Sequence, residues 1–269
     1  MRLGISSYTY TWAVGVPGSM PEKPMQVYEL IDKAFAWNLS LVQIADNLPL
    51  ENLTLSELRS LEQYASGKGV SIEMGGRGLT AGHTLKCLET AVTLGSPILR
   101  MVIDNQDFKP DLQSIISTIN DFVPELKSKK IKLAIENHDR FKAREFERII
   151  NSVGSDMVGI CLDSVNSMGA GEGFENVSEI LAPYTFNLHI KDFSIHRVSH
   201  KMGLIIEGCP AGKGMLDIPG LLNLINSYVR CNSAILELWT PPAEKIEATI
   251  KKEAKWAEES IEYLKSVIK

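Results

Sequence analysis

The stretch Ile131-Lys-Leu-Ala-Ile-Glu-Asn-His-Asp-Arg-Phe141 decides how the rest of the chain is interpreted. Its first half alternates β-branched and aliphatic residues, which predicts a buried strand. The strand runs without a turn signal into a polar cluster made of Glu136, Asn137, His138 and Asp139. Side chains that can bind a metal or move a proton are therefore expected at the end of a rigid element.

Three later apolar stretches follow the same pattern. One ends at Asp163, the second contains His189, and the third contains Glu237. Each stretch thus offers one carboxylate or imidazole near the C-terminal end of a predicted strand. This repetition is the strongest functional signal in the sequence.

Strand and helix signals alternate along the whole chain. The predicted strands are 2–6, 41–45, 70–74, 98–103, 131–136, 158–163, 186–192 and 235–239. The predicted helices are 24–38, 54–68, 83–94, 111–127, 142–153, 174–181, 216–228 and 243–268. Such alternation indicates a parallel sheet with right-handed crossovers, and eight units in this length are typical of a (β/α)8 TIM barrel.

The main alternative fold is a doubly wound open sheet. That fold usually carries a glycine-rich phosphate loop after its first strand. Residues 7–12 read SYTYTW and contain no glycine. We therefore expect one domain, residues 1–269, that forms an α/β barrel with an eight-stranded parallel core and outer helices.

Composition narrows the functional classes. The 269 residues are 44% hydrophobic, with a formal net charge of -5 and a pI of about 5.6, which disfavours a nucleic-acid partner. The four cysteines form no C-x-x-C pair, which indicates a reducing compartment. The chain shows no apolar leader and no run of membrane-spanning length. These features predict a cytoplasmic protein that acts on a small molecule, without a membrane partner.

Barrel closure would bring the four strand ends around one mouth. Three carboxylates and one imidazole suit a hard or borderline divalent cation, so we expect Mn2+ or Mg2+, with Zn2+ or Co2+ as alternatives. Any one of these acids could instead cap a helix or pair with a lysine. Four of them on successive strands favour a metal site formed by Glu136, Asp163, His189 and Glu237.

Several motifs carry a resemblance to a known family. They are Ala134–His138, Cys161–Asn166, Leu188–Asp192, Gly212–Asp217 and Leu236–Leu238. The chain resembles the xylose isomerase-like TIM barrels, the sugar isomerase and epimerase superfamily that also contains endonuclease IV. The resemblance implies that the four residues named above hold one divalent ion. It also implies that Glu136 and Glu237 act as an acid–base pair on opposite sides of the sugar.

A second group of residues is expected to bind the substrate. It comprises Tyr8, Trp12, His138, Asn166, Lys191 and Arg197. Two long segments follow predicted strands. Segment 7–23 contains Tyr8 and Trp12, and segment 193–215 contains Arg197. Such long loops are often functional. The competing interpretations are loop packing for the aromatic residues, an ion pair with a nearby acid for Lys191, and a solvated loop side chain for Arg197.

Four functions remain to be compared. The first is a metal-dependent isomerase or epimerase of a sugar or sugar acid, acting through a stabilised enediolate. The second is a lyase of the same fold, either a decarboxylase of a 3-oxo sugar acid or a dehydratase. A DNA-repair endonuclease would need further histidines after the third, fourth and sixth strands, where this chain has none. A non-catalytic binding module is disfavoured by the intact ligand set, and a homo-oligomer is an open alternative.

Overall fold

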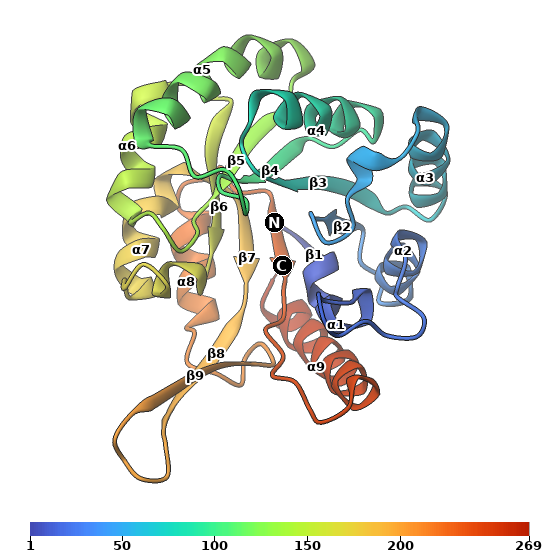
Figure 1. Cartoon of the computed structure of the whole chain (residues 1–269), viewed down its shortest axis with the longest axis vertical. Helices are drawn as coiled ribbons and strands as arrows, with labels where there is room; N and C mark the ends of the chain where they lie inside the picture. Colours follow the sequence, from blue (N-terminus) through green and yellow to red (C-terminus); the bar gives the residue numbers. More distant parts are fainter. Residues whose placement is uncertain (269) are drawn as a thin grey trace.

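The computed structural model describes residues 1–268, within which eight parallel strands close into a barrel (Figure 1). The barrel strands are β1 (Arg2–Ser6), β2 (Leu41–Ile44), β3 (Ser71–Arg77), β4 (Ile98–Val102), β5 (Lys132–Glu136), β6 (Val158–Asp163), β7 (Thr185–Ile190) and β10 (Ser233–Leu236). They follow chain order around the ring, and β10 pairs with both β7 and β1. The predicted (β/α)8 architecture is confirmed.

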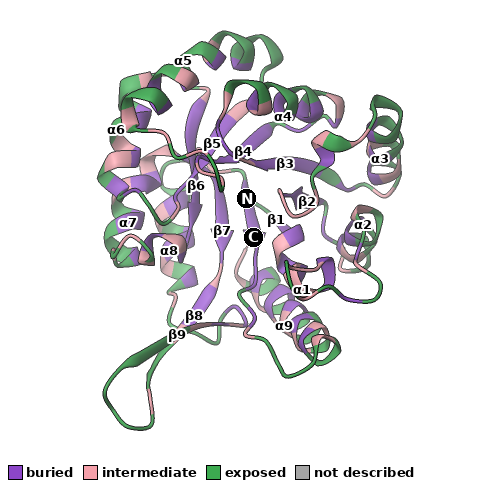
Figure 2. Ribbon diagram, in the orientation of Figure 1, coloured by how far each residue is buried: buried purple, intermediate pink, exposed green. Residues whose placement is uncertain are grey.

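Helices surround the barrel. They are α2 (Val27–Ala36), α3 (Leu55–Gly67), α4 (Ala81–Thr93), α5 (Leu112–Lys129), α6 (Ala143–Val153), α7 (Phe174–Leu181), α8 (Ile218–Asn226) and α9 (Ile246–Val267). Figure 2 shows buried inner faces and exposed outer faces. In α6, buried Phe146, Ile149 and Ile150 recur at helical spacing and form the apolar stripe that packs inward. Gly154, at a φ of 61°, ends this helix in the left-handed region that glycine favours.

The segment 193–215 differs from the expected loop. It belongs largely to an antiparallel hairpin of β8 (Asp192–Arg197) and β9 (Leu204–Cys209), which extends away from the barrel at the lower left of Figure 1. Only Lys191 separates β7 from β8. The two strands therefore read as one continuous run in the sequence. No turn signal shows where the barrel strand ends and the hairpin begins.

The segment 7–23 is also more ordered than expected. It contains a 3₁₀ helix, η1 (Ser7–Tyr10), and the short helix α1 (Thr11–Val14). The Glu253 carboxylate on α9 accepts hydrogen bonds from the backbone N–H groups of Trp12 at 2.9 Å and Ala13 at 3.1 Å. The backbone N–H groups of this turn are thus satisfied by a residue about 240 positions away in the sequence. A local sequence pattern cannot reveal such a contact.

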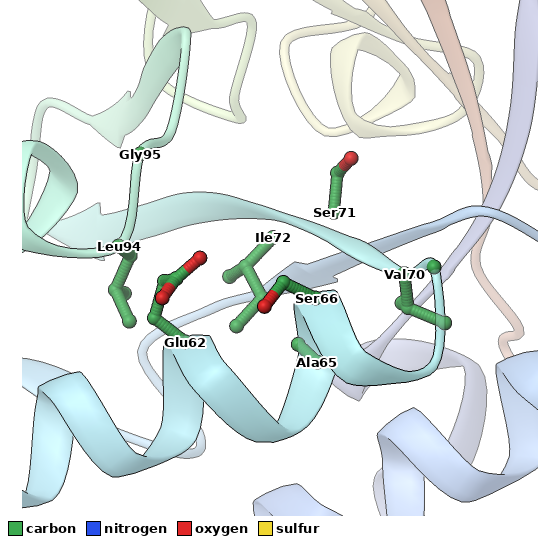
Figure 3. Close-up of a pocket in the computed structure, with 9 residues that line it drawn as sticks. Glu62, Ala65, Ser66, Val70, Ser71, Ile72, Leu94 and Gly95 are labelled. Atoms are coloured by element: carbon green, nitrogen blue, oxygen red, sulfur yellow. The ribbon is translucent and has the colours of Figure 1, made fainter.

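A hollow of about 340 Å³ lies between the end of α3 and the start of β3 (Figure 3). Ala65, Ser66, Ser71 and Ile72 line it. It is at the N-terminal end of the strand, whereas TIM-barrel active sites form at the C-terminal ends. We therefore place the functional site elsewhere. In residues 1–268, no helix is both long and apolar enough to cross a membrane.

Candidate active site and metal centre

The structure brings the four expected ligands together inside the C-terminal mouth of the barrel. Glu136 ends β5, Asp163 ends β6, His189 lies in β7, and Glu237 directly follows β10. All four are at most 1% exposed. His189 Nδ1 lies 3.5 Å from Glu136 Oε2, 3.7 Å from Asp163 Oδ2 and 3.5 Å from Glu237 Oε1. The imidazole nitrogen is therefore the common centre of the cluster.

Gln43 on β2 fixes the orientation of this imidazole. Its Oε1 lies 2.6 Å from His189 Nε2, while its Nε2 donates to Asn187 Oδ1 at 3.0 Å and Glu73 Oε2 at 3.2 Å. Because the amide nitrogen faces two acceptors, the amide oxygen must face His189, whose Nε2 then carries a proton. In the neutral ring, Nδ1 is left with a lone pair that points at the three carboxylates.

Three buried atoms around this centre lack a hydrogen-bond partner. They are Asp163 Oδ2, His189 Nδ1 and Glu237 Oε2. Ligand atoms of these three residues lie within 4.8 Å of one another. The two oxygens contact only the Lys191 ammonium, at 2.8 and 2.9 Å, and buried polar atoms rarely lack a hydrogen bond. Two carboxylate oxygens with one imidazole nitrogen suit a divalent cation. The residues present therefore fit a metal ion held by Asp163, His189 and Glu237.

Lys191 lies next to the same oxygens. Its ammonium is 2.8 Å from Asp163 Oδ2 and 2.9 Å from Glu237 Oε2, ion pairs without hydrogen-bond geometry. Burial lowers the pKa of Lys191, but these two carboxylates outweigh burial and hold its pKa above the usual value. Lys191 is thus a permanent cation at the site.

The carboxylates on this side of the site also have pKa values below their usual range. Burial raises the pKa of Asp163, and the charges of Lys191 and His189 more than offset it. Burial likewise raises the pKa of Glu237, which His189 and Lys191 reverse. For His189, burial lowers the pKa, while Glu237 and Glu136 raise it above its usual value. Asp163 and Glu237 are thus held in their charged form by the cations that face them.

Other groups orient the two carboxylates that bear the unpaired oxygens. Asp163 Oδ1 accepts hydrogen bonds from the backbone N–H groups of Val165 at 2.8 Å and Asn166 at 2.9 Å. Ser6 Oγ donates to Glu237 Oε1 at 2.9 Å. One oxygen of each carboxylate is thus anchored. The second oxygen of Asp163, Oδ2, faces His189 Nδ1, whereas the second oxygen of Glu237, Oε2, lies beside Lys191. Outer contacts of this kind orient metal ligands.

Glu136 is in a different situation, because both of its oxygens are occupied. Arg100 Nε donates to Oε2, and Asn166 Nδ2 donates to Oε1 at 2.7 Å. The Arg100 side chain is 2% exposed, and its Nη1 also contacts Asp46 Oδ1 at 3.3 Å. Burial lowers the pKa of Arg100, but Glu136 and Asp46 raise it well above its usual value, so the guanidinium stays charged.

The sequence analysis did not include Arg100, Gln43 or Asp46. Asp46 joins the arginine network to the cavity, since its Oδ2 accepts from Arg77 Nε at 2.8 Å and from the Tyr8 hydroxyl at 3.2 Å. Arg100 and Gln43 each stand alone among the apolar residues of a barrel strand. A lone polar residue inside a buried strand is the signal that could have identified both.

A cavity of about 410 Å³ opens beside the cluster. Three of the predicted substrate-binding residues, Tyr8, Asn166 and Lys191, line it. Its apolar wall is formed by Val165, Met168, Leu238 and Trp239. Aromatic and aliphatic surface next to an ion cluster suits a small polyol that carries a charged group.

The other three predicted substrate-binding residues lie outside this lining. The Trp12 indole N–H donates to the Thr240 carbonyl at 2.8 Å, which ties the α1 segment to the barrel rim. His138 Nδ1 lies 3.3 Å from Asp139 Oδ2. Arg197 is exposed on β8 and donates to the Lys201 carbonyl at 3.3 Å. The hairpin therefore carries Arg197 away from the site.

The sequence of the chain is similar to those of known proteins. The model of the xylose isomerase-like TIM barrel family matches residues 76–267. A 3-oxo-isoapionate decarboxylase of Pectobacterium atrosepticum is 30% identical over 264 residues, which cover 98% of this chain and 95% of the relative.

Solved structures match over nearly the full length. D-psicose 3-epimerase with D-tagatose from Clostridium cellulolyticum H10 has a TM-score of 0.76 at 12% identity and covers 100% of both chains. A xylose isomerase-like TIM barrel protein from Mycobacterium smegmatis in complex with magnesium has a TM-score of 0.69 at 12% identity, over 98% of this chain and 97% of that one. These identities show the shared fold alone. By its family model and its 30% identical relative, the chain belongs to the xylose isomerase-like TIM barrel family.

Proposed function

We propose that the chain is a divalent-metal-dependent decarboxylase of a 3-oxo sugar acid. The observation that carries this proposal is the state of Glu136. An epimerase needs one carboxylate to remove a proton and another to return it on the opposite face. Both oxygens of Glu136 already accept hydrogen bonds, from Arg100 and Asn166, so proton transfer from a substrate carbon to this carboxylate would have to compete with two donors.

Decarboxylation makes a smaller demand on the protein. The bond between C1 and C2 breaks, CO2 leaves, and the bonding electron pair moves into the 3-oxo group. C2 then takes up one proton. A divalent ion at Asp163, His189 and Glu237 would act as a Lewis acid toward negative charge on the 3-oxo oxygen.

Lys191 is suited to assist at the same point. Its ammonium lines the cavity and stays charged because of Asp163 and Glu237. A fixed cation that faces the developing negative charge lowers the barrier without reorganisation. The apolar wall around Val165 and Leu238 would receive the leaving CO2, which needs no hydrogen-bond partner.

Tyr8 is the proposed source of the proton. Its hydroxyl lines the cavity and contacts Asp46 Oδ2 at 3.2 Å. Burial and the Asp46 charge raise the pKa of Tyr8 to about 12, so the phenol holds its proton at neutral pH. It could deliver that proton to C2 and recover one from solvent that enters the cavity.

The 30% identical relative supports the same reaction class, since its name is that of a 3-oxo acid decarboxylase. The second candidate is epimerisation or isomerisation of a sugar. In its favour, both glutamates face His189 Nδ1, each at 3.5 Å. It would require Glu136 to leave Arg100 and Asn166.

The two candidates give different products in D2O. The purified protein with Mn2+ should release CO2 from 3-oxo-isoapionate and place deuterium at the carbon that lost the carboxylate. A keto-sugar without a carboxylate should exchange no deuterium. Deuterium uptake into such a sugar, without CO2 from the oxo acid, would favour the epimerase instead.

A further inference from the structure

The β8–β9 hairpin has one apolar face and one mixed face. Ile195 pairs with Ile206 and Arg197 pairs with Leu204 across the two strands. Because successive side chains alternate between the faces, these four residues share one face. Ile205 lies between Leu204 and Ile206 and therefore points to the opposite face.

This apolar face is open to solvent. The exposed fractions are 37% for Ile195, 58% for Leu204 and 41% for Ile206. A two-stranded hairpin on its own is marginally stable in water, and its outer edges are unpaired. The barrel has no such edges, because its sheet is closed. An exposed apolar face on an extended hairpin indicates a binding surface.

A groove of complementary character lies next to the base of the hairpin. It runs between α7 and α8 and holds about 200 Å³. Phe174, Met215, Leu221 and Leu224 give it an apolar lining, and Met215 is 62% exposed. Three acids, Glu175, Glu179 and Asp217, also line it.

The charges of the two surfaces are opposite. Arg197 and Lys201 are exposed on the hairpin, and neither forms a salt bridge within residues 1–268. Glu175 and Glu179 are exposed at the groove, and over the same described residues they too pair with no cation. The hairpin thus offers apolar side chains and cations to a groove that offers apolar side chains and acids. That complementarity identifies a second copy of this chain as the occupant.

We propose that the protein forms a two-fold symmetric dimer in which each hairpin lies in the α7–α8 groove of the other copy. Phe193, at the base of the hairpin, already lines the groove of its own chain, so the two surfaces are adjacent. The strands lead away from that groove (Figure 1), so the tip cannot fill it within one chain. A two-fold axis between the surfaces lets both exchanges form at once, as an isologous interface requires.

Neighbouring isoleucines provide a matched test of this interface. Ile205 and Ile206 have the same exposed fraction, 41%, but face opposite sides of the hairpin. Sedimentation velocity at micromolar concentration should give a dimer for the wild-type chain, about twice its mass of 29.8 kDa. Ile206→Asp should sediment as a monomer, whereas Ile205→Asp should stay dimeric. A monomeric wild type, or equal behaviour of the two variants, would overturn the proposal.

Charge reversal tests the same contact without changing an apolar side chain. Glu179→Arg and Arg197→Glu should each weaken the dimer at least ~10-fold, because each places like charges together. The double variant should recover most of the lost affinity. If it dimerises no better than the single variants, the hairpin does not lie against α7. This pair also decides the question if Ile206→Asp fails to fold.

Discussion

The two sides of the ion cluster use the same type of side chain in opposite ways. Glu136 Oε2 and Glu237 Oε1 lie at the same distance, 3.5 Å, from His189 Nδ1. Glu136 is held on both oxygens by Arg100 and Asn166, whereas Glu237 accepts a hydrogen bond from Ser6 on Oε1 and its Oε2 contacts the Lys191 ammonium at 2.9 Å. Position at a strand end therefore does not define the role of a buried carboxylate. Its hydrogen-bond partners do.

The largest expected effect concerns the side of the cluster that contains Asp163 and Glu237. Asp163→Ala should reduce bound metal from about one ion per chain to background, because it removes an oxygen from the buried donor set. The matched control is Asp139→Ala, which removes another carboxylate from the same cavity but not from the cluster. Elemental analysis of both proteins measures the difference. Full metal content in Asp163→Ala would place the ion elsewhere.

The role of the Arg100–Glu136 pair, on the other side of the cluster, can be tested through the free energy of unfolding. Arg100→Met should leave Glu136 buried without its cation and cost roughly 3–5 kcal/mol of unfolding free energy. Arg77 also pairs with Asp46, but its side chain is 32% exposed, so Arg77→Met should cost ~1 kcal/mol or less. Urea denaturation compares the two. Equal costs would mean that the Arg100–Glu136 pair does not stabilise the barrel.

A third buried carboxylate sharpens the comparison, because its partners are neutral. Glu253 accepts only backbone N–H groups, and burial raises its pKa to about 7. Between pH 4.5 and pH 7 the folded state then binds more protons than the unfolded state, so stability falls as the pH rises. The loss should be on the order of 3 kcal/mol. Glu253→Gln should flatten this part of the pH profile, and an unchanged slope would assign it to other groups.

The smallest expected effect concerns the orientation of His189. Gln43→Leu removes the acceptor that faces His189 Nε2 but leaves every metal ligand in place. Loss of such an orienting contact typically weakens metal affinity about 10- to 100-fold. Titration with Mn2+ measures it. Unchanged affinity would show that packing alone holds the imidazole.

The order of the barrel elements and the positions of the four polar side chains at strand ends could be predicted, because both depend on local patterns. Alternating strand and helix signals specify the barrel, and the chemistry of Asp163 or His189 is visible in the residue type. The contacts that separate Glu136 from Glu237 were not predictable in the same way. Arg100 comes from a neighbouring strand, and nothing in the spacing of the two residues states that they meet.

The hairpin and the α1 segment escaped prediction for a related reason. β8 continues the apolar run of β7 after a single residue, so no turn signal separates them. The N–H groups of Trp12 and Ala13 are satisfied by Glu253, on the last helix of the chain. Both features depend on tertiary contacts, which a sequence pattern does not contain.

The comparison of Glu136→Gln with Glu237→Gln tests the central claim most directly. With saturating Mn2+, CO2 release from 3-oxo-isoapionate should fall at least ~10²-fold in Glu237→Gln, because the variant loses a charged ligand of the ion that would stabilise the developing negative charge. Glu136→Gln should stay within about 10-fold of wild type, because Gln keeps an oxygen that can accept from Arg100 and no proton passes through this residue. Equal losses of ~10²-fold or more in both variants would contradict the account and make Glu136 a direct participant in proton transfer.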